Sequence, residues 1–116
     1  MANPNIVNVT NIAAGTAAGE APTGLTSVLT AASNTVIKVN SIIIANKDGT
    51  NDADISVAFY NGSARYLARL ITVPASATLV VISKDTALYL TEGTSIQVQS
   101  SVSGDLDYVI SYETIS

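Results

Sequence analysis

Residues 73–98 read VPASATLVVISKDTALYLTEGTSIQV, and this stretch decides the fold class. The pattern predicts a strand that stops at Pro74, because proline has no N–H to donate to a strand ladder. Short apolar runs then follow at residues 79–82, 88–90 and 96–98, and Gly93 marks a turn before the last of them. A chain that reverses this often between short apolar runs is typical of antiparallel β structure.

The rest of the chain repeats this pattern of short alternating runs. Strands are expected at residues 24–31, 35–46, 53–60, 66–73 and 106–113. In 35–46 the apolar face switches between Val39 and Ile42, which predicts either a bulge or a strand covered on both sides. In 53–60 we expect Ile55, Val57 and Phe59 to point inward and Asp54, Ser56 and Ala58 outward. Eight or nine short strands with no significant helix predict an all-β antiparallel sandwich or jelly roll.

The N-terminal segment 1–22 is expected to differ from the β-sandwich domain at 23–116. Residues 5–13 are acceptable for a strand, whereas residues 14–22, AGTAAGEAP, are small and glycine-rich and predict a loop or flexible arm. Two readings stay open. The segment is either a first strand followed by a loop, or an arm that adds a strand to the sheet of a partner subunit.

Composition excludes several classes of function. The chain has 116 residues and a net charge of −4, and its five Lys and Arg residues are scattered singly, so it lacks the basic stripe of a nucleic-acid binder. No apolar run approaches the roughly 20 residues of a membrane-spanning helix, and the N-terminus has no signal-peptide pattern. Only 12% of the residues are charged, which predicts that part of the surface is covered by a partner.

Catalytic chemistry has few candidate groups in this sequence. Histidine and cysteine are absent, which removes the common general base, the thiolate nucleophile and the usual zinc ligands. Asp105 and Asp107 would share a face in a strand and could act as a carboxylate pair, although residues of this kind far more often flank a surface turn. We therefore expect no enzyme activity and no cofactor.

Two candidate ligand sites remain. The loop 46–54 carries Asp48, Asn51, Asp52 and Asp54, whose oxygens could bind Ca²⁺ or simply cap a turn. Tyrosines could form a carbohydrate platform, which makes a sugar-binding adhesin a further alternative. Tyr60 and Tyr66 flank the hairpin signal Asn61-Gly62-Ser63 and are the candidates for such contacts.

Tyr108 and Tyr112 alternate with Leu106 and Ile110, so we expect these two tyrosines to be buried in the core.

Several short motifs between residues 41 and 116 carry a resemblance to a known group of proteins. They are SIIIANKDGT at 41–50, VPA at 73–75, LYLTEG at 88–93, SGDL at 103–106 and SYE at 111–113. On these motifs the chain resembles small β-sandwich structural proteins in the virions of tailed bacteriophages, cyanobacterial phages among them.

The resemblance implies a capsid decoration, or cement, protein located in the virion. It implies the major capsid protein as a partner and self-association as a homo-oligomer such as a trimer. A tail, neck or fibre-attachment component is the alternative. The interface candidates are Ile6, Val7, Val9, Tyr60 and Tyr66.

Overall fold

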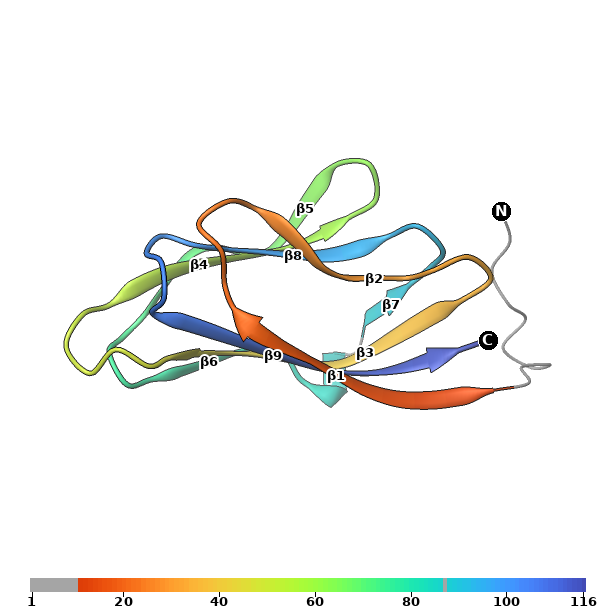
Figure 1. Ribbon diagram of the computed structural model, residues 1–116, viewed down its shortest axis with the longest axis horizontal. Helices are drawn as coiled ribbons and strands as arrows, with labels where there is room; N and C mark the ends of the chain where they lie inside the picture. Colours follow the sequence, from red (N-terminus) through yellow and green to blue (C-terminus); the bar gives the residue numbers. More distant parts are fainter. Residues whose placement is uncertain (1–10, 87) are drawn as a thin grey trace.

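Two antiparallel sheets packed face to face form the fold (Figure 1). The computed structural model describes residues 11–86 and 88–116. One sheet has the order β1-β9-β3-β6, with β7 also paired to β3, and the other has the order β2-β8-β4-β5. The strands are β1 (Ile12–Glu20), β2 (Thr26–Thr30), β3 (Val36–Asn46), β4 (Ala53–Tyr60), β5 (Ala64–Val73), β6 (Thr78–Ile82), β7 (Leu88–Leu90), β8 (Ser95–Ser100) and β9 (Leu106–Ile115). The predicted all-β antiparallel sandwich is confirmed.

Helix is limited, in the described ranges, to the three-residue 3₁₀ turn η2 (Lys84–Thr86) between β6 and β7. None of the described helical segments has the length and apolar character needed to cross a membrane.

The core lies between the two sheets and is built from aliphatic side chains. The largest of the completely buried ones are Ile42, Ile44, Ile55, Leu90, Ile96, Leu106 and Ile110. Each side chain of this kind contributes about 1.5–3 kcal/mol when it leaves water. Tyr108 and Tyr112, which were predicted to be buried in the core, are half-buried and pack against this cluster.

A bulge in β3 resolves the switch of apolar face in that strand. The pairing register of β3 with β9 shifts between Val39 and Ser41, and the extra residue turns both Val39 and Ile42 toward the core. Of the two explanations that the sequence left open, the bulge is confirmed.

The prediction of a loop or arm over residues 14–22 is wrong, because most of that segment forms β1. Its glycines pair directly with tyrosines of β9, Gly15 with Tyr112 and Gly19 with Tyr108. A Cβ at Gly15 would lie 2.6 Å from Cζ of Tyr112, so the ring occupies the space that a side chain would need. The small residues therefore accommodate aromatic neighbours and do not indicate flexibility.

Most of the strand predicted at residues 5–13, with Ile6, Val7 and Val9, lies outside the described residues.

The outward face of β4 also differs from the prediction. Ile55 and Val57 are buried as expected, but Ser56 and Ala58, predicted to be exposed, are buried too. The register of β5 against β4 shifts twice, and the displaced backbone N–H of Leu70 donates a hydrogen bond of 3.0 Å to Oγ of Ser56. The irregular backbone of β5 thus contacts Ser56, a residue that a regular edge strand would leave exposed to water.

Candidate interaction surface

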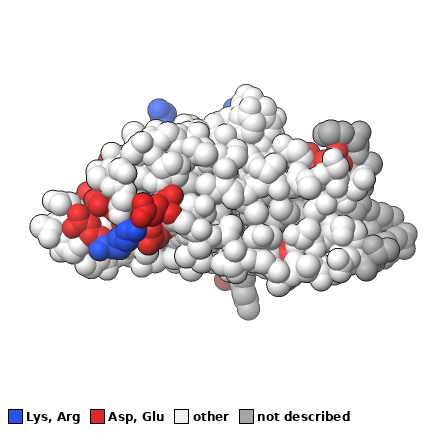
Figure 2. Space-filling model, in the orientation of Figure 1, with Lys and Arg blue, Asp and Glu red and all other residues white. Residues whose placement is uncertain are grey.

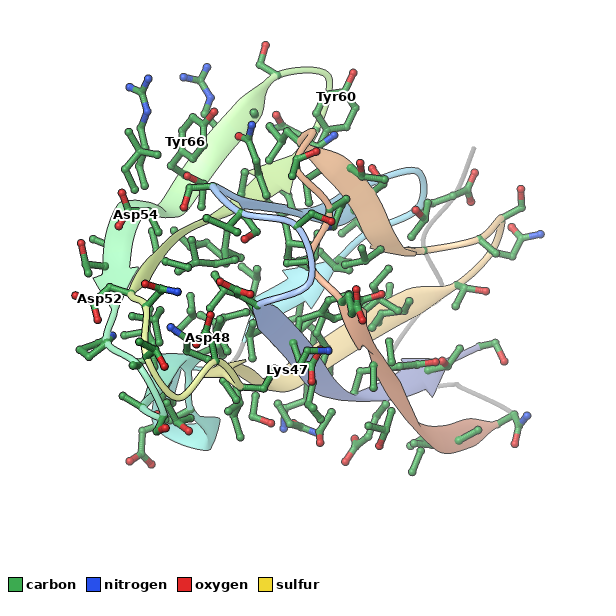
Figure 3. All side chains as sticks on the ribbon, turned by 60° about the vertical axis from the view of Figure 1, so that its left-hand side comes forward. Lys47, Asp48, Asp52, Asp54, Tyr60 and Tyr66 are labelled. Atoms are coloured by element: carbon green, nitrogen blue, oxygen red, sulfur yellow. The ribbon has the colours of Figure 1, made fainter. Side chains whose placement is uncertain are left out.

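The β4–β5 hairpin carries five of the ten exposed large hydrophobic residues in the described part of the chain, together with two exposed arginines. Tyr60 and Tyr66 lie on one face of it, because Tyr66 pairs with Ala58, which shares a face with Tyr60. Both rings are exposed, by 37% and 44%, and the hairpin projects from the body of the sandwich (Figures 1 and 3). We define the hairpin surface as the exposed residues on both faces of the hairpin, with Arg65 paired to Phe59 and Ile71 to Ile55 on the face opposite the two tyrosines. Its members are Tyr60, Arg65, Tyr66, Leu67, Arg69, Leu70 and Ile71.

Leu70 is the most unusual residue of the hairpin surface. Its φ angle is +50°, in the left-handed region that a bulky side chain rarely adopts, and its side chain is 61% exposed. Such a conformation costs on the order of 1–3 kcal/mol, and here the bond from Leu70 N–H to Ser56 Oγ helps to hold it. The hairpin therefore maintains a strained backbone at a position where a leucine side chain points into water.

Arginine accompanies the apolar side chains on this surface. The guanidinium of Arg69 lies over the ring of Tyr66, with Cζ 5.2 Å from the ring centroid, which is within the range of a cation–π contact. Tyrosine and arginine are among the residues most enriched at the positions that contribute most of the binding energy in protein interfaces. The same stacking covers one of the two faces of the Tyr66 ring and so reduces the aromatic area open to a sugar, which favours a protein partner.

Acidic residues gather at the end of the sandwich where β1 ends and β9 begins (Figure 2). The ammonium of Lys47 lies 3.0 Å from Oε1 of Glu20 and 3.1 Å from Oδ1 of Asp107. These hydrogen bonds, the one to Glu20 first, raise the pKa of Lys47 above its usual value. Lys47 thus ties the end of β3 to β1 and β9 and offsets part of the local negative charge.

The proposed calcium loop forms an ordered turn in which each acidic side chain has a different partner (Figure 3). Asp48 accepts hydrogen bonds from the backbone N–H groups of Thr50 and Asn51, and these bonds lower the pKa of Asp48. Asp52 accepts one from Ala75 N–H. The loop joins the β5–β6 turn through that bond and does not gather its oxygens around one point.

Asp54, the last residue of this candidate set, accepts a hydrogen bond from the Thr72 hydroxyl on β5. Across the described ranges, no group of three or more His, Cys, Asp or Glu side chains is placed to hold a metal ion. Buried Asn46 organises the loop from below, donating to the carbonyls of Asn51 and Val73 and accepting from Asp48 N–H.

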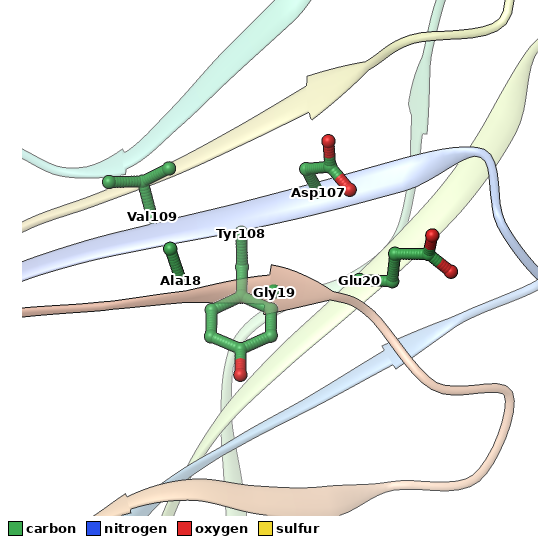
Figure 4. A pocket seen from close by; sticks show the side chains of 6 residues that line it. All are labelled: Ala18, Gly19, Glu20, Asp107, Tyr108 and Val109. Carbon is green, nitrogen blue, oxygen red and sulfur yellow. The ribbon is translucent and has the colours of Figure 1, made fainter.

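The two residues of the candidate carboxylate pair have different surroundings. Asp107 is engaged with Lys47, whereas Asp105 lies in the turn before β9, where its carbonyl accepts a hydrogen bond from Lys47 N–H. A shallow, open hollow of about 300 Å³ lies nearby along β1 and β9 (Figure 4). It is lined by Ala18, Gly19, Glu20, Asp107, Tyr108 and Val109.

Sequence reasoning identified Tyr60 and Tyr66 but missed the rest of the hairpin surface. Leu67, Leu70 and Ile71 looked like ordinary members of an alternating strand, and only the register shifts of β5 expose them together. The one available signal was that residues 66–71 are apolar or basic at almost every position, on both faces of the predicted strand.

Comparison with known proteins adds no assignment, since no protein-family model matches the chain and no curated protein matches it significantly.

Proposed function

We propose that this protein is a virion structural subunit of a tailed bacteriophage, a capsid decoration protein that binds the outer face of the assembled head. The hairpin surface carries the proposal, because it combines exposed apolar side chains with two arginines in a small domain. Exposed patches of this composition are typical of sites that bind another protein. The sequence resemblance at residues 41–116 supports a phage virion as the assembly to which this surface binds.

The mechanism is thermodynamic. A subunit that binds the closed shell but not its dissociated parts stabilises the shell by mass action. At a free concentration of about 100 times Kd, each occupied site adds roughly 2.7 kcal/mol. No bond is made or broken, which agrees with a sequence that has neither histidine nor cysteine.

The partner surface is expected to be apolar and bordered by carboxylates. Arg65 and Arg69 bring positive charge to the hairpin surface, whereas the chain as a whole has a net charge of −4. Arginine forms forked hydrogen bonds with carboxylates, and its flat guanidinium stacks on the aromatic ring of Tyr66. In this proposal the major capsid protein supplies that surface.

The experiment is binding of the purified chain to heads that lack it. Wild-type protein should sediment with the heads and raise the temperature at which they release DNA. Tyr66→Ala should weaken this binding more than tenfold, which matches the loss of one central contact of about 1.4 kcal/mol or more. Val80→Ala is the control, because Val80 is similarly exposed but lies on β6, away from the hairpin.

No binding to heads, with binding to purified tails or necks, would move the protein to the alternative virion location. Binding to glycans that is lost in the Tyr60→Ala and Tyr66→Ala variants would instead establish the adhesin alternative.

A further inference from the structure

Within the described ranges, the outer edge of β1 presents a continuous row of backbone groups that no other strand pairs with. Asn11 and Ser116 exchange two backbone hydrogen bonds at one end of the β1–β9 ladder, and Ala21 N–H donates to Leu106 at the other. The register between these ends is unbroken, so the backbone N–H and C=O groups of the odd-numbered residues point toward β9. The N–H and C=O groups of Ile12, Ala14, Thr16, Ala18 and Glu20 therefore point away from the sheet, where no other described strand pairs with them.

The other described edges are shorter or interrupted. β2 has five residues and a register shift, β5 has two shifts, and β6 and β7 have five and three residues. β1 is nine residues long and regular, and its only charged residue, Glu20, is paired with Lys47. Proteins usually block such edges with bulges, lysines or proline, and β1 has none of these.

We infer that β1 pairs with β1 of a second copy of this chain, antiparallel and across a two-fold axis at Thr16. Thr16 then faces Thr16 of the second copy, Ala14 faces Ala18, and Ile12 faces Glu20, so five facing pairs with two bonds each give about ten backbone hydrogen bonds. The two Glu20 carboxylates lie at opposite ends of this ribbon, so no like charges meet. β1 is already an ordered strand, so little conformational entropy is lost.

The hollow along β1 and β9 supports a second copy as the occupant. Ile12 has a 59% exposed side chain, which points to the outer face of the sheet together with Ala18 and Glu20. In the two-fold arrangement, Ile12 of one copy lies beside Ala18 of the other, and Ala18 pairs with Val109 in the wall of the hollow. Each copy thus places an exposed isoleucine beside Ala18, at the rim of the open depression of its neighbour, whose lining residues are shown in Figure 4.

Proline at position 16 tests this pairing with the free chain. The Thr16 N–H points outward, so Thr16→Pro removes a bond to the second copy and none to β9, and proline is tolerated at such edge positions. Wild-type protein and Thr16→Ala should sediment as dimers, whereas Thr16→Pro should sediment as a monomer with an unchanged circular dichroism spectrum. A wild-type monomer at the highest soluble concentration, or equal association of a folded Thr16→Pro, would overturn the inference.

Cysteine crosslinking tests the register and does not depend on how proline affects folding. The natural chain has no cysteine, so Thr16→Cys should form a disulfide-linked dimer on mild oxidation, because facing Cα atoms are about 5.5 Å apart. Ala14→Cys should not form this disulfide, because position 14 of one copy lies roughly 13 Å along the ribbon from position 14 of the other. Equal crosslinking of the two variants would contradict the axis at Thr16. Both experiments use free protein, so their failure would leave the proposed binding to heads unaffected.

Discussion

Two tyrosines of β9 explain how β1, a strand of mostly small residues, remains part of the sheet. The ring of Tyr112 occupies the space over Gly15, and the ring of Tyr108 lies beside Gly19, with its hydroxyl 3.1 Å from where a Cβ would stand. Aromatic residues that cover glycines in a neighbouring strand replace the packing that the glycines lack. The stability of β1 therefore depends on tyrosines that belong to β9.

Gly15→Ala tests this packing. The added methyl group overlaps the Tyr112 ring, and we expect a loss of about 1–3 kcal/mol in the free energy of unfolding, measured by urea denaturation. Gly24→Ala is the control, because no atom lies within 4 Å of its added Cβ. In a Tyr112→Ala background the change at Gly15 should cost nothing. An equal loss in both backgrounds would contradict the account.

Leu70 connects backbone strain to binding. Asparagine adopts positive φ more readily than leucine, and Leu70→Asn keeps the N–H that donates to Ser56. We expect its free energy of unfolding to stay equal or to rise by up to about 1 kcal/mol, while binding to heads weakens. Urea denaturation and co-sedimentation measure the two effects. A variant that loses stability and keeps binding would show that Leu70 is structural and makes no contact.

At the scale of the element, the β3–β4 loop illustrates why acidic residues in a turn are ambiguous in sequence. Asx turns and calcium sites recruit the same side chains, and the difference lies in where the oxygens point. Asp48 caps its own loop, Asp52 reaches Ala75, and Asp54 reaches Thr72. The partners of Asp54 and Asp52 are 18 and 23 residues away in sequence, so a local pattern could not reveal them.

The Asp48 cap predicts a stability that depends on pH. Hydrogen bonds to its carboxylate lower the pKa of Asp48 below 3.8, so the folded state binds a proton there less readily than the unfolded state. Its contribution is complete above pH 3.8 and is lost as the pH falls through the lower folded-state pKa. In Asp48→Asn the fall in stability between pH 5 and about pH 2.5 should be smaller than in wild type, measured by urea denaturation.

Asp85→Asn, in the 3₁₀ turn η2, is the control for this measurement. If Asp48→Asn and Asp85→Asn show the same pH profile as wild type, the cap does not act through the charge of Asp48.

At this scale the sequence predicted much of the fold. Alternation placed β4 at its observed bounds, and Pro74 and Gly93 marked real turns, because these signals arise from local backbone chemistry. β1 was missed because its strand character depends on tyrosines about 90 residues away in the sequence. The burial of Ser56 was missed for a similar reason, since it depends on bulges in a neighbouring strand.

At the scale of the whole molecule, the acidic end, the uncharged face and the projecting hairpin are separate regions of the surface. Charge is concentrated at the acidic end, most of the face in Figure 2 is uncharged, and the hairpin projects with its tyrosines, leucines and arginines. A sandwich with one open edge at β1 and one projecting hairpin has separate surfaces for a second copy and for a larger assembly. Sequence alone indicated the two tyrosines and, as one of two readings, an arm over residues 1–22 that adds a strand to a partner's sheet. It did not indicate the regular open edge of β1, which depends on the strand order.

The number of copies per virion, measured by quantitative mass spectrometry against the major capsid protein, tests the central claim most directly. A decoration protein that follows the symmetry of the head should be present in on the order of hundreds of copies. About six to eighteen copies, the numbers set by the symmetry of a neck, tail or fibre attachment, would contradict a location on the head, and absence from the particle would contradict the proposed function altogether.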